Sequence, residues 1–155
     1  MHPAFSVIIF TTASGAGFGL LCWLGIYAAA SGLPDNRLFA FVSIALALGV
    51  VAFGLLSSMF HLGHPERAWR AFSQWRSSWL SREGVVSTLT FIPTLVFAAG
   101  WILLNRSDGI FALSAVLMSA LAILAVICTA GIYNSLKPIP AWNNRWVMPN
   151  YVALA

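Results

Sequence analysis

Four long stretches of this sequence contain no Asp, Glu, Lys or Arg, and this feature limits the possible folds more than any other. They cover residues 1–34, 38–65, 84–105 and 109–136. Each is longer than the roughly 20 residues that a helix needs to cross the hydrocarbon core of a bilayer. A helix pairs its own backbone N–H and C=O groups, which an open chain in lipid must do. We therefore expect transmembrane helices.

The predicted spans cover about residues 5–30, 38–60, 84–104 and 110–134. Only 8% of the residues are charged, whereas an ordinary soluble domain carries roughly 25%, so a soluble globule is excluded. Three connections join the four spans, and none of them has the character of an interdomain linker. The fold class that we predict is an all-α integral membrane protein: one domain over residues 1–155, with four transmembrane helices in an antiparallel bundle plus one interfacial amphipathic helix.

The charged residues gather at one end of the predicted bundle. Because each span reverses direction, the N-terminus, the loop of residues 61–83 and the tail after residue 136 share one face, here called face A. The turns near Asp35 and Arg106 share the opposite face, face B. Face A carries Arg67, Arg70, Arg76, Arg82, Lys137 and Arg145, and face B carries Arg37 and Arg106. The positive-inside rule then places face A, and with it the N-terminus, in the cytoplasm.

The net charge of +4 does not indicate a nucleic-acid partner. With so few charged residues in the sequence, an excess of basic ones indicates loops that face the negative surface of a lipid bilayer.

Polar residues at the ends of the spans also gather on face A. His61 ends the second span, Glu83 opens the third, and Tyr133 and Asn134 end the fourth. An ionisable residue at the membrane boundary is costly unless it is paired, faces water or has a function. Glu83 is therefore a functional candidate. The alternative is that Glu83 caps the third helix from its first turn, where the helix dipole favours an acid.

For His61 two interpretations also stay open. Its imidazole can exchange protons near neutral pH, or it can bond to a backbone carbonyl at a helix end. His64 lies three residues further on, beside a proline, and is the weaker candidate.

The sequence offers no pattern for a bound metal, haem or iron–sulfur cluster. None of the three histidines lies in the middle of a span, where the axial ligands of a membrane haem are placed. Cys22 and Cys128 lie apart inside apolar stretches, which suits small packing residues. We expect no metal and no cofactor held by this protein.

The loop of residues 61–83 contains an aromatic stripe with interleaved arginines. Its aromatic residues follow one another at spacings of three, three and four, which is helical periodicity. The aromatic positions are Trp69, Phe72, Trp75 and Trp79. The pattern predicts an interfacial helix over about residues 65–80 that lies in the headgroup plane. It serves either as a membrane anchor or as a docking surface for a soluble subunit, since Trp and Arg are frequent at binding hot spots.

Small residues mark the first span. They include a Gly15-xxx-Gly19 pair, a pattern that lets two helix backbones approach closely in lipid. We expect the first helix to pack closely against a neighbour through these residues: Ala13, Ser14, Gly15, Ala16, Gly17 and Gly19.

Three segments resemble the membrane anchor subunit of dimethyl sulfoxide reductases. They are HPAFSVIIFTTASGAGFGL near the start, SSMFHLGHPERAWRAFSQWRSSWLSRE in the middle and IYNSLKPIPAW towards the end. The middle segment is the specific one, because it joins a helix end, an HLG turn, an Arg/aromatic helix and a second helix start in a fixed order. The resemblance covers nearly the whole sequence.

The resemblance implies a haem-free anchor in the bacterial inner membrane. Such an anchor holds an iron–sulfur subunit and a molybdopterin catalytic subunit, oxidises menaquinol as its bound substrate, and passes on the electrons in anaerobic respiration. The family's quinol-site histidine corresponds to His61 and its functional glutamate to Glu83. We add His64, Tyr133 and Asn134 as further quinol-binding candidates.

The Arg/aromatic helix would form the docking surface for the iron–sulfur subunit. Its candidate residues are Trp69, Arg70, Trp75, Arg76 and Trp79. Anchors of this family have more spans than the four expected here, so this sequence corresponds to an N-terminal half.

Two other functions compete with quinol oxidation. The protein could be a passive anchor or assembly module in which His61 and Glu83 have no chemical role. A small transporter is the weaker alternative, because no predicted span carries an ionisable residue at its middle.

Overall fold

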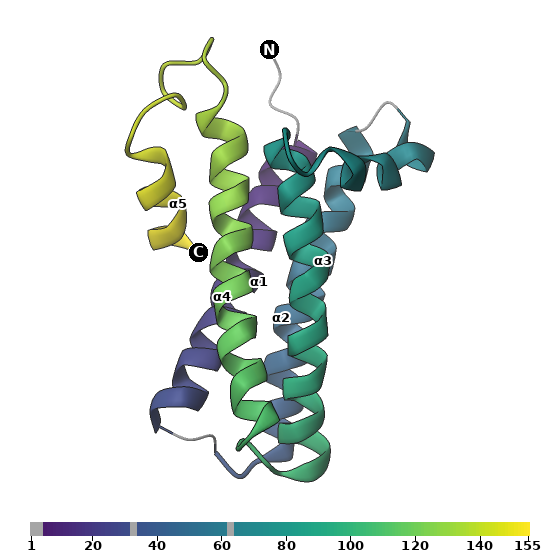
Figure 1. The fold of residues 1–155 in the computed structure, drawn as a ribbon, viewed down its shortest axis with the longest axis vertical. Coiled ribbons are helices and arrows are strands. Elements are labelled where there is room, and N and C mark those ends of the chain that lie inside the picture. The colour runs from purple at the N-terminus through teal and green to yellow at the C-terminus, as the bar shows by residue number, and fades with distance from the viewer. Residues whose placement is uncertain (1–4, 32–33, 62–63) are drawn as a thin grey trace.

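The computed structural model describes residues 5–31, 34–61 and 64–155, apart from the side chains of residues 31, 61, 65 and 71. Within this part of the chain the only regular elements are helices (Figure 1). Four are long: α1 (Phe5–Ser31), α2 (Arg37–Ser58), α3 (Trp79–Ala98) and α4 (Ile110–Asn134). The short ones are η1 (Met59–His61), η2 (Pro65–Gln74), η3 (Ala99–Leu104) and α5 (Val147–Leu154).

The predicted all-α class with four membrane-spanning helices is confirmed. Four helical segments are long and apolar enough to span a membrane: Phe5–Ala30, Arg37–Ser58, Trp79–Leu104 and Ile110–Asn134. In an 18-residue stretch of each segment only 28% to 44% of the residues are buried inside the protein, and many large apolar side chains are exposed on the outer surface. Such a surface suits lipid rather than water.

The third span begins earlier than the prediction of about residue 84. Ser78 is the N-cap of α3, and its side chain accepts a hydrogen bond from the backbone N–H of Ser81 at 3.4 Å. A serine in this position satisfies a backbone donor that the first helical turn leaves unpaired. The helix therefore starts at Trp79, and Trp79 belongs to the span rather than to the interfacial segment predicted over residues 65–80.

The four long helices do not contact one another equally. α1 packs along both α2 and α4, and α3 packs along α4. α2 and α3 make few contacts directly, and their strongest connection is through η3, the π-helix that continues α3 at face B. The side of the bundle between α2 and α3 is thus closed at face B and less closely packed towards face A.

Glycines bring α1 and α2 close together, but they are not the predicted pair. A Cβ atom on Gly17 would lie 2.6 Å from the Val51 side chain, and a Cβ atom on Gly54 would lie 2.5 Å from the backbone nitrogen of Ser14. Gly15 has open space beside it. The predicted role of Gly15 in close packing is therefore wrong, and Gly17, another of the small residues, approaches α2 instead. Gly19 does pack closely, but against the backbone of Ala155 after α5.

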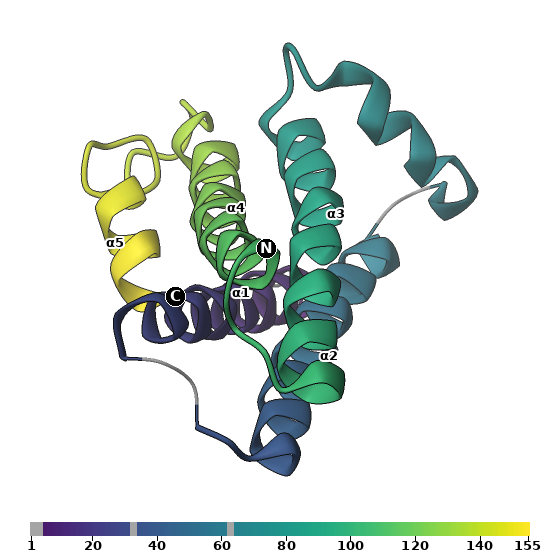
Figure 2. The same ribbon diagram turned by 60° about the horizontal axis from the view of Figure 1, so that its bottom comes forward.

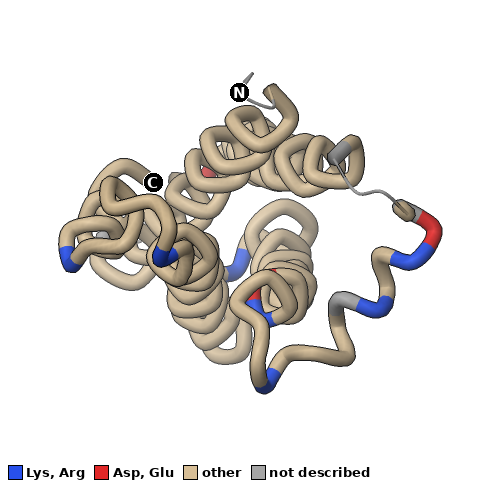
Figure 3. Tube along the Cα trace, turned by 90° about the horizontal axis from the view of Figure 1, so that it is seen from above, with Lys and Arg blue, Asp and Glu red and all other residues tan. Residues whose placement is uncertain are grey.

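The two faces of the molecule are arranged as the alternation of the spans predicts. The connection between α1 and α2 and that between α3 and α4 lie at the lower end in Figure 1, face B, while η2 and the tail lie at the upper end, face A. Figure 2 shows α5 folded back beside α4. Seen from above, face A carries Lys and Arg along the η2 segment and on the tail (Figure 3).

An aromatic cluster closes the bundle at face B. Trp101 of η3 is 2% exposed, and its ring lies 5.9 Å from that of Phe39 and 5.6 Å from that of Phe97. Its indole N–H donates to the carbonyl oxygen of Pro34 at 3.2 Å. This cluster ties α2, α3 and the connection between α1 and α2 together.

Candidate functional site

A cavity of about 470 Å³ lies at face A, where α2 and α3 are less closely packed. Its wall comes from α1, the end of α2 with η1, η2 and the start of α3. The lining residues are Phe10, Leu55, Ser58, Met59, His64, Arg67, Ala68, Phe72, Leu80, Glu83 and Gly84. Most of them are apolar, and a few polar side chains stand among them. This is the usual character of a small-molecule site, and the volume falls in the usual range.

Glu83 is the buried acid of this wall. It is the fifth residue of α3 and is 2% exposed. The alternative that it caps α3 from the first turn is wrong, because the first turn contains no acid and the cap is Ser78. The other three carboxylic residues, Asp35, Glu66 and Asp108, are all exposed. Glu83 is therefore the carboxyl group inside the bundle.

The carboxylate of Glu83 is held by α4. The hydroxyl of Thr129, itself 4% exposed, donates a hydrogen bond to Glu83 Oε1. The neighbouring Arg82 points elsewhere: its guanidinium donates to the backbone carbonyls of Trp75 and Arg76 at 3.0 and 2.7 Å. Among the ion pairs of the described residues, none involves Glu83. A buried carboxyl group without a counter-charge is costly, which favours a functional role.

The two histidine candidates stand differently. His61 is the last residue of η1, two positions after the lining residue Met59, but its side chain lies outside the described residues, as do residues 62 and 63 of the HLG turn. His64 lines the cavity. Its Nδ1 lies 3.0 Å from Glu66 Oε1, and its side chain is 69% exposed.

Tyr133 and Asn134 lie on another side of α4. The ring of Tyr133 packs 5.0 Å from that of Trp142 and 5.5 Å from that of Tyr151, between α4 and the tail. The backbone carbonyl of Asn134 accepts a hydrogen bond from the Asn143 side chain at 2.6 Å. Neither residue lines the cavity that holds Glu83, so their assignment to the quinol site stays a prediction.

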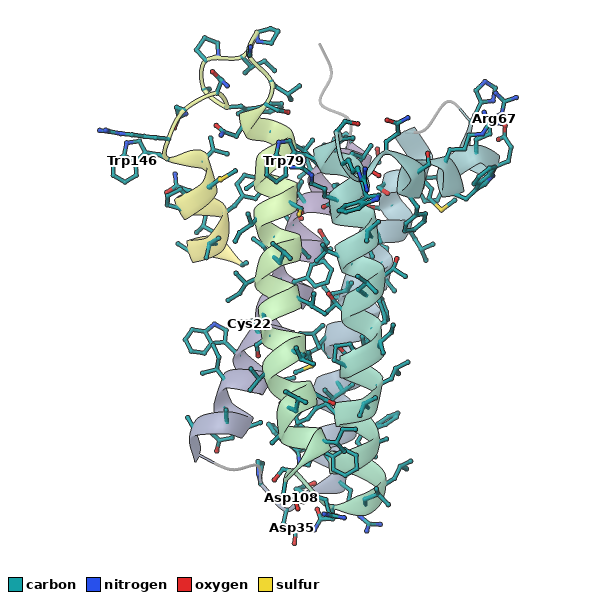
Figure 4. The ribbon with its side chains drawn as sticks, viewed as in Figure 1. Cys22, Asp35, Arg67, Trp79, Asp108 and Trp146 are labelled. Atoms are coloured by element: carbon teal, nitrogen blue, oxygen red, sulfur yellow. The ribbon has the colours of Figure 1, made fainter. Side chains whose placement is uncertain are left out.

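The proposed docking segment is a 3-10 helix, η2. A 3-10 helix has three residues per turn, so side chains three apart lie in one row. Trp69, Phe72 and Trp75 follow this spacing and are exposed. The guanidinium groups of Arg70 and Arg76 lie 5.6 Å from the rings of Trp69 and Trp75, respectively. Figure 4 shows Arg67 at the outer end of this segment.

Trp79 differs from the other four docking candidates. It is half-buried, and a Cβ atom on Gly131 of α4 would come within 2.6 Å of its ring. The Arg82 guanidinium covers the ring at 4.6 Å. In Figure 4 the Trp79 side chain lies at the face A end beside α4. Its ring therefore packs within the bundle, which leaves less of it for a partner.

Within the described part of the chain, no group of three or more His, Cys, Asp or Glu residues could hold a metal ion. Cys22 and Cys128 are buried free cysteines on α1 and α4. Among the described side chains on the cavity wall, His64 and Glu83 can form hydrogen bonds and exchange protons.

Thr129 is the site residue that the sequence did not indicate. A threonine in an apolar helix commonly bonds its own helix four residues back, and Thr129 does so with the carbonyl of Ala125 at 3.1 Å. Its second contact, to Glu83, joins residues 46 positions apart. Only the packing of α3 on α4 brings these two residues together.

Comparison with protein families gives the chain its relatives. The model of the family "DMSO reductase anchor subunit (DmsC)" matches residues 1–154. The chain belongs to this family. DMSO reductase anchor subunits are membrane subunits of reductase-type complexes, and the four candidate spans make this member a multi-pass membrane protein.

Two curated proteins are similar to this anchor subunit. The C subunit of the sulfite dehydrogenase of Allochromatium vinosum is 39% identical, and the match covers 99% of this chain and 52% of that protein. The C component of the anaerobic dimethyl sulfoxide reductase of Escherichia coli is 28% identical, over 63% of this chain and 34% of that protein. The chain thus spans about half the length or less of these relatives. No solved structure matches it.

Proposed function

We propose that this anchor subunit binds menaquinol in the face A cavity and oxidises it. The observation that carries the proposal is the position of Glu83, a buried carboxyl group in the wall of an otherwise largely apolar cavity. The ring of a quinol needs apolar walls, and its hydroxyl groups need hydrogen-bonding partners that can take protons. The cavity supplies both, next to a surface that faces lipid.

Oxidation of menaquinol to menaquinone releases two protons and two electrons. We assign the protons to His61 and Glu83, which accept them from the two quinol hydroxyl groups and release them to water at face A. Histidine exchanges protons near neutral pH, and a positioned base of this kind accelerates proton transfer by roughly 10²–10⁴-fold. To His64, which lines the cavity and is exposed, we assign the transfer of a proton outward.

The two electrons leave to an acceptor outside this protein. We assign them to an iron–sulfur cluster in a partner subunit that docks on η2 through Trp69, Arg70, Trp75 and Arg76. A molybdopterin subunit beyond it would reduce the terminal substrate. The basic residues of face A support an orientation in which the docked partner and the N-terminus lie on the cytoplasmic side of a bacterial inner membrane.

The test uses membranes that carry the assembled complex. His61→Ala and Glu83→Gln should each lower menaquinol-driven turnover by about 100-fold, because each removes a proton acceptor. Turnover with an artificial donor that feeds the partner subunits directly should change by less than about twofold. Asp108→Asn, which alters a carboxylate at face B, is the matched control and should leave both rates unchanged.

Two results would contradict the proposal. Equal loss with both donors would mean that the variants damage assembly rather than a quinol site. Full menaquinol-driven turnover in both variants would leave the passive anchor as the function. Binding of a fluorescent quinol-site inhibitor to the protein, and its loss in His61→Ala, checks the site independently of turnover.

The same cavity could also work in the opposite direction, with menaquinone reduced to menaquinol. The similarity to a subunit of a sulfite dehydrogenase favours this second candidate, since a dehydrogenase removes electrons from its substrate. His61 and Glu83 would then donate the two protons. Formation or consumption of menaquinol by the wild-type complex, followed by absorbance, decides between the two directions.

A further inference from the structure

The hydrogen bond between Thr129 and Glu83 joins two membrane-spanning helices through side chains at both ends. Two other bonds between spans end on the backbone: Ser119 donates to the carbonyl of Cys22 at 3.0 Å, and Ser57 donates to the carbonyl of Ser6 at 3.2 Å. The Thr129–Glu83 bond is also buried at both ends. It therefore fixes the position of a group that can gain and lose a proton.

Two acceptor oxygens lie near the single hydrogen of the Thr129 hydroxyl group. They are Glu83 Oε1 and the carbonyl oxygen of Ala125, the latter at 3.1 Å. A hydroxyl group also has lone pairs that accept a hydrogen bond. When Glu83 is ionised, Thr129 can donate to the carboxylate. When Glu83 is protonated, the carboxylic O–H can donate to Thr129, and Thr129 can donate to Ala125.

Both arrangements keep the carboxyl group bonded to α4 without a change of rotamer. A buried polar group that loses its hydrogen-bond partner costs about 1–3 kcal/mol. A partner that could bond only the ionised or only the protonated carboxyl group would therefore let the group turn away in the other protonation state. Thr129 serves both states, and no main-chain movement is required.

We propose that Thr129 is the positioning residue for Glu83: it holds the carboxyl group at the cavity wall in both protonation states by reversing the direction of their hydrogen bond. This inference deepens the proposed quinol chemistry and rests on it for its functional consequence. Thr129 does not line the cavity that contains Glu83, so it acts through Glu83 and not on the quinol.

The first experiment measures menaquinol-driven turnover in membranes with the assembled complex. Thr129→Val keeps the shape of the side chain and removes the hydroxyl group, and it should lower kcat about tenfold with KM unchanged within about twofold. Thr129→Ser restores the hydroxyl group and should recover at least half of the wild-type kcat. Ser119→Ala is the matched control on α4, since it also removes a buried hydroxyl group and should leave kcat unchanged.

The second experiment records the infrared carboxyl band of the protein in lipid vesicles. The sequence has four carboxylic side chains, and three are exposed, so the band that disappears in Glu83→Gln belongs to Glu83. Thr129→Val should shift this band, because the carboxyl group loses its hydrogen bond, and Thr129→Ser should return it to the wild-type position.

The outcomes separate this inference from the proposed function. An unshifted band in Thr129→Val, or a serine variant as slow as the valine variant, would overturn the positioning role. If instead Glu83→Gln keeps full menaquinol-driven turnover, the proposed function fails, and the infrared band still tests the hydrogen bond by itself.

Discussion

The two ends of the bundle are built from the same helices but are closed in different ways. At face B, α2 and α3 meet through Trp101, whose ring contacts Phe39 and Phe97 and whose N–H bonds to a backbone carbonyl. At face A the same two helices leave a cavity of about 470 Å³ with Glu83 in its wall. One end is filled by a large aromatic side chain, and the other provides space beside a buried carboxyl group.

Because of this difference, the residues that contribute most to stability lie at face B, and the residues of the proposed quinol site lie at face A. Large buried aromatic side chains contribute much of the packing energy of a protein, and the Trp101 cluster places that contribution far from Glu83. The face A end can then keep a cavity, which lowers packing, without loss of the fold.

The largest effect that we expect is on stability, from Trp101→Ala. Removal of a buried tryptophan ring costs about 3 kcal/mol or more, so the melting temperature of the protein in detergent should fall markedly. Trp101→Phe keeps a ring and loses the bond to Pro34, and it should cost about 1 kcal/mol. At temperatures below the melting transition, menaquinol-driven turnover of either variant should stay within about twofold of wild type. If a variant loses turnover but keeps its melting temperature, Trp101 contributes to the activity as well, and the two ends do not have separate roles.

A smaller effect should follow when the cavity at face A is filled. Gly84 lines the cavity, and a Cβ atom there would lie 3.7 Å from Phe72, an ordinary contact. Gly84→Ala should therefore bind a quinol-site inhibitor as wild type does. Gly84→Leu places a branched side chain in the space and should weaken binding about tenfold, or about 1.4 kcal/mol. Both residues favour a helix more than glycine does, so the fold should persist. Equal affinity in all three forms would place the site elsewhere.

The smallest effect should come from the surface charges at face B. The Arg106 side chain donates two hydrogen bonds to Asp108, at 3.0 and 2.8 Å, and these bonds hold the pKa of the Asp108 carboxyl below its usual range. A lowered pKa in the folded state stabilises the protein above the unfolded pKa, and this stabilisation is lost as the pH falls through the folded value.

Asp108→Asn should therefore lower the melting temperature slightly at neutral pH, and the difference from wild type should vanish in acid. Asp35→Asn, at the same face (Figure 4), controls for a general effect of charge. If both variants melt alike at every pH, the Arg106–Asp108 pair does not carry the effect.

The sequence predicted the helices well because a long uncharged stretch has few alternatives. The exceptions were α5, which the sequence did not predict, the shorter extent of η2, and the start of α3. A hydropathy rule places the boundary at the charged residues Arg82 and Glu83, whereas the Ser78 cap starts the helix at Trp79. One charge, Arg82, turns back to backbone carbonyls, and the other, Glu83, is buried.

The candidate site was predicted only in part. Glu83 could be predicted because a carboxyl group at the membrane boundary is energetically costly unless it is paired, faces water or has a function. The cavity could not be predicted from the sequence. It arises where α2 and α3 are less closely packed, and the hydrophobic periodicity of each helix does not determine how closely two helices pack. Tyr133 and Asn134 lie at the same end of the bundle as Glu83 but do not line its cavity, because a shared depth in the membrane does not fix the direction of a side chain.

The contacts of Arg82 have a mechanical consequence. Its guanidinium donates hydrogen bonds to the carbonyls of Trp75 and Arg76 and covers the ring of Trp79. These contacts connect the segment that precedes α3 to the first turn of α3. Glu83 is the next residue in the sequence. A displacement of η2 is therefore passed on to the start of α3 by the Arg82 side chain as well as by the main chain, one residue from the buried carboxyl group of Glu83.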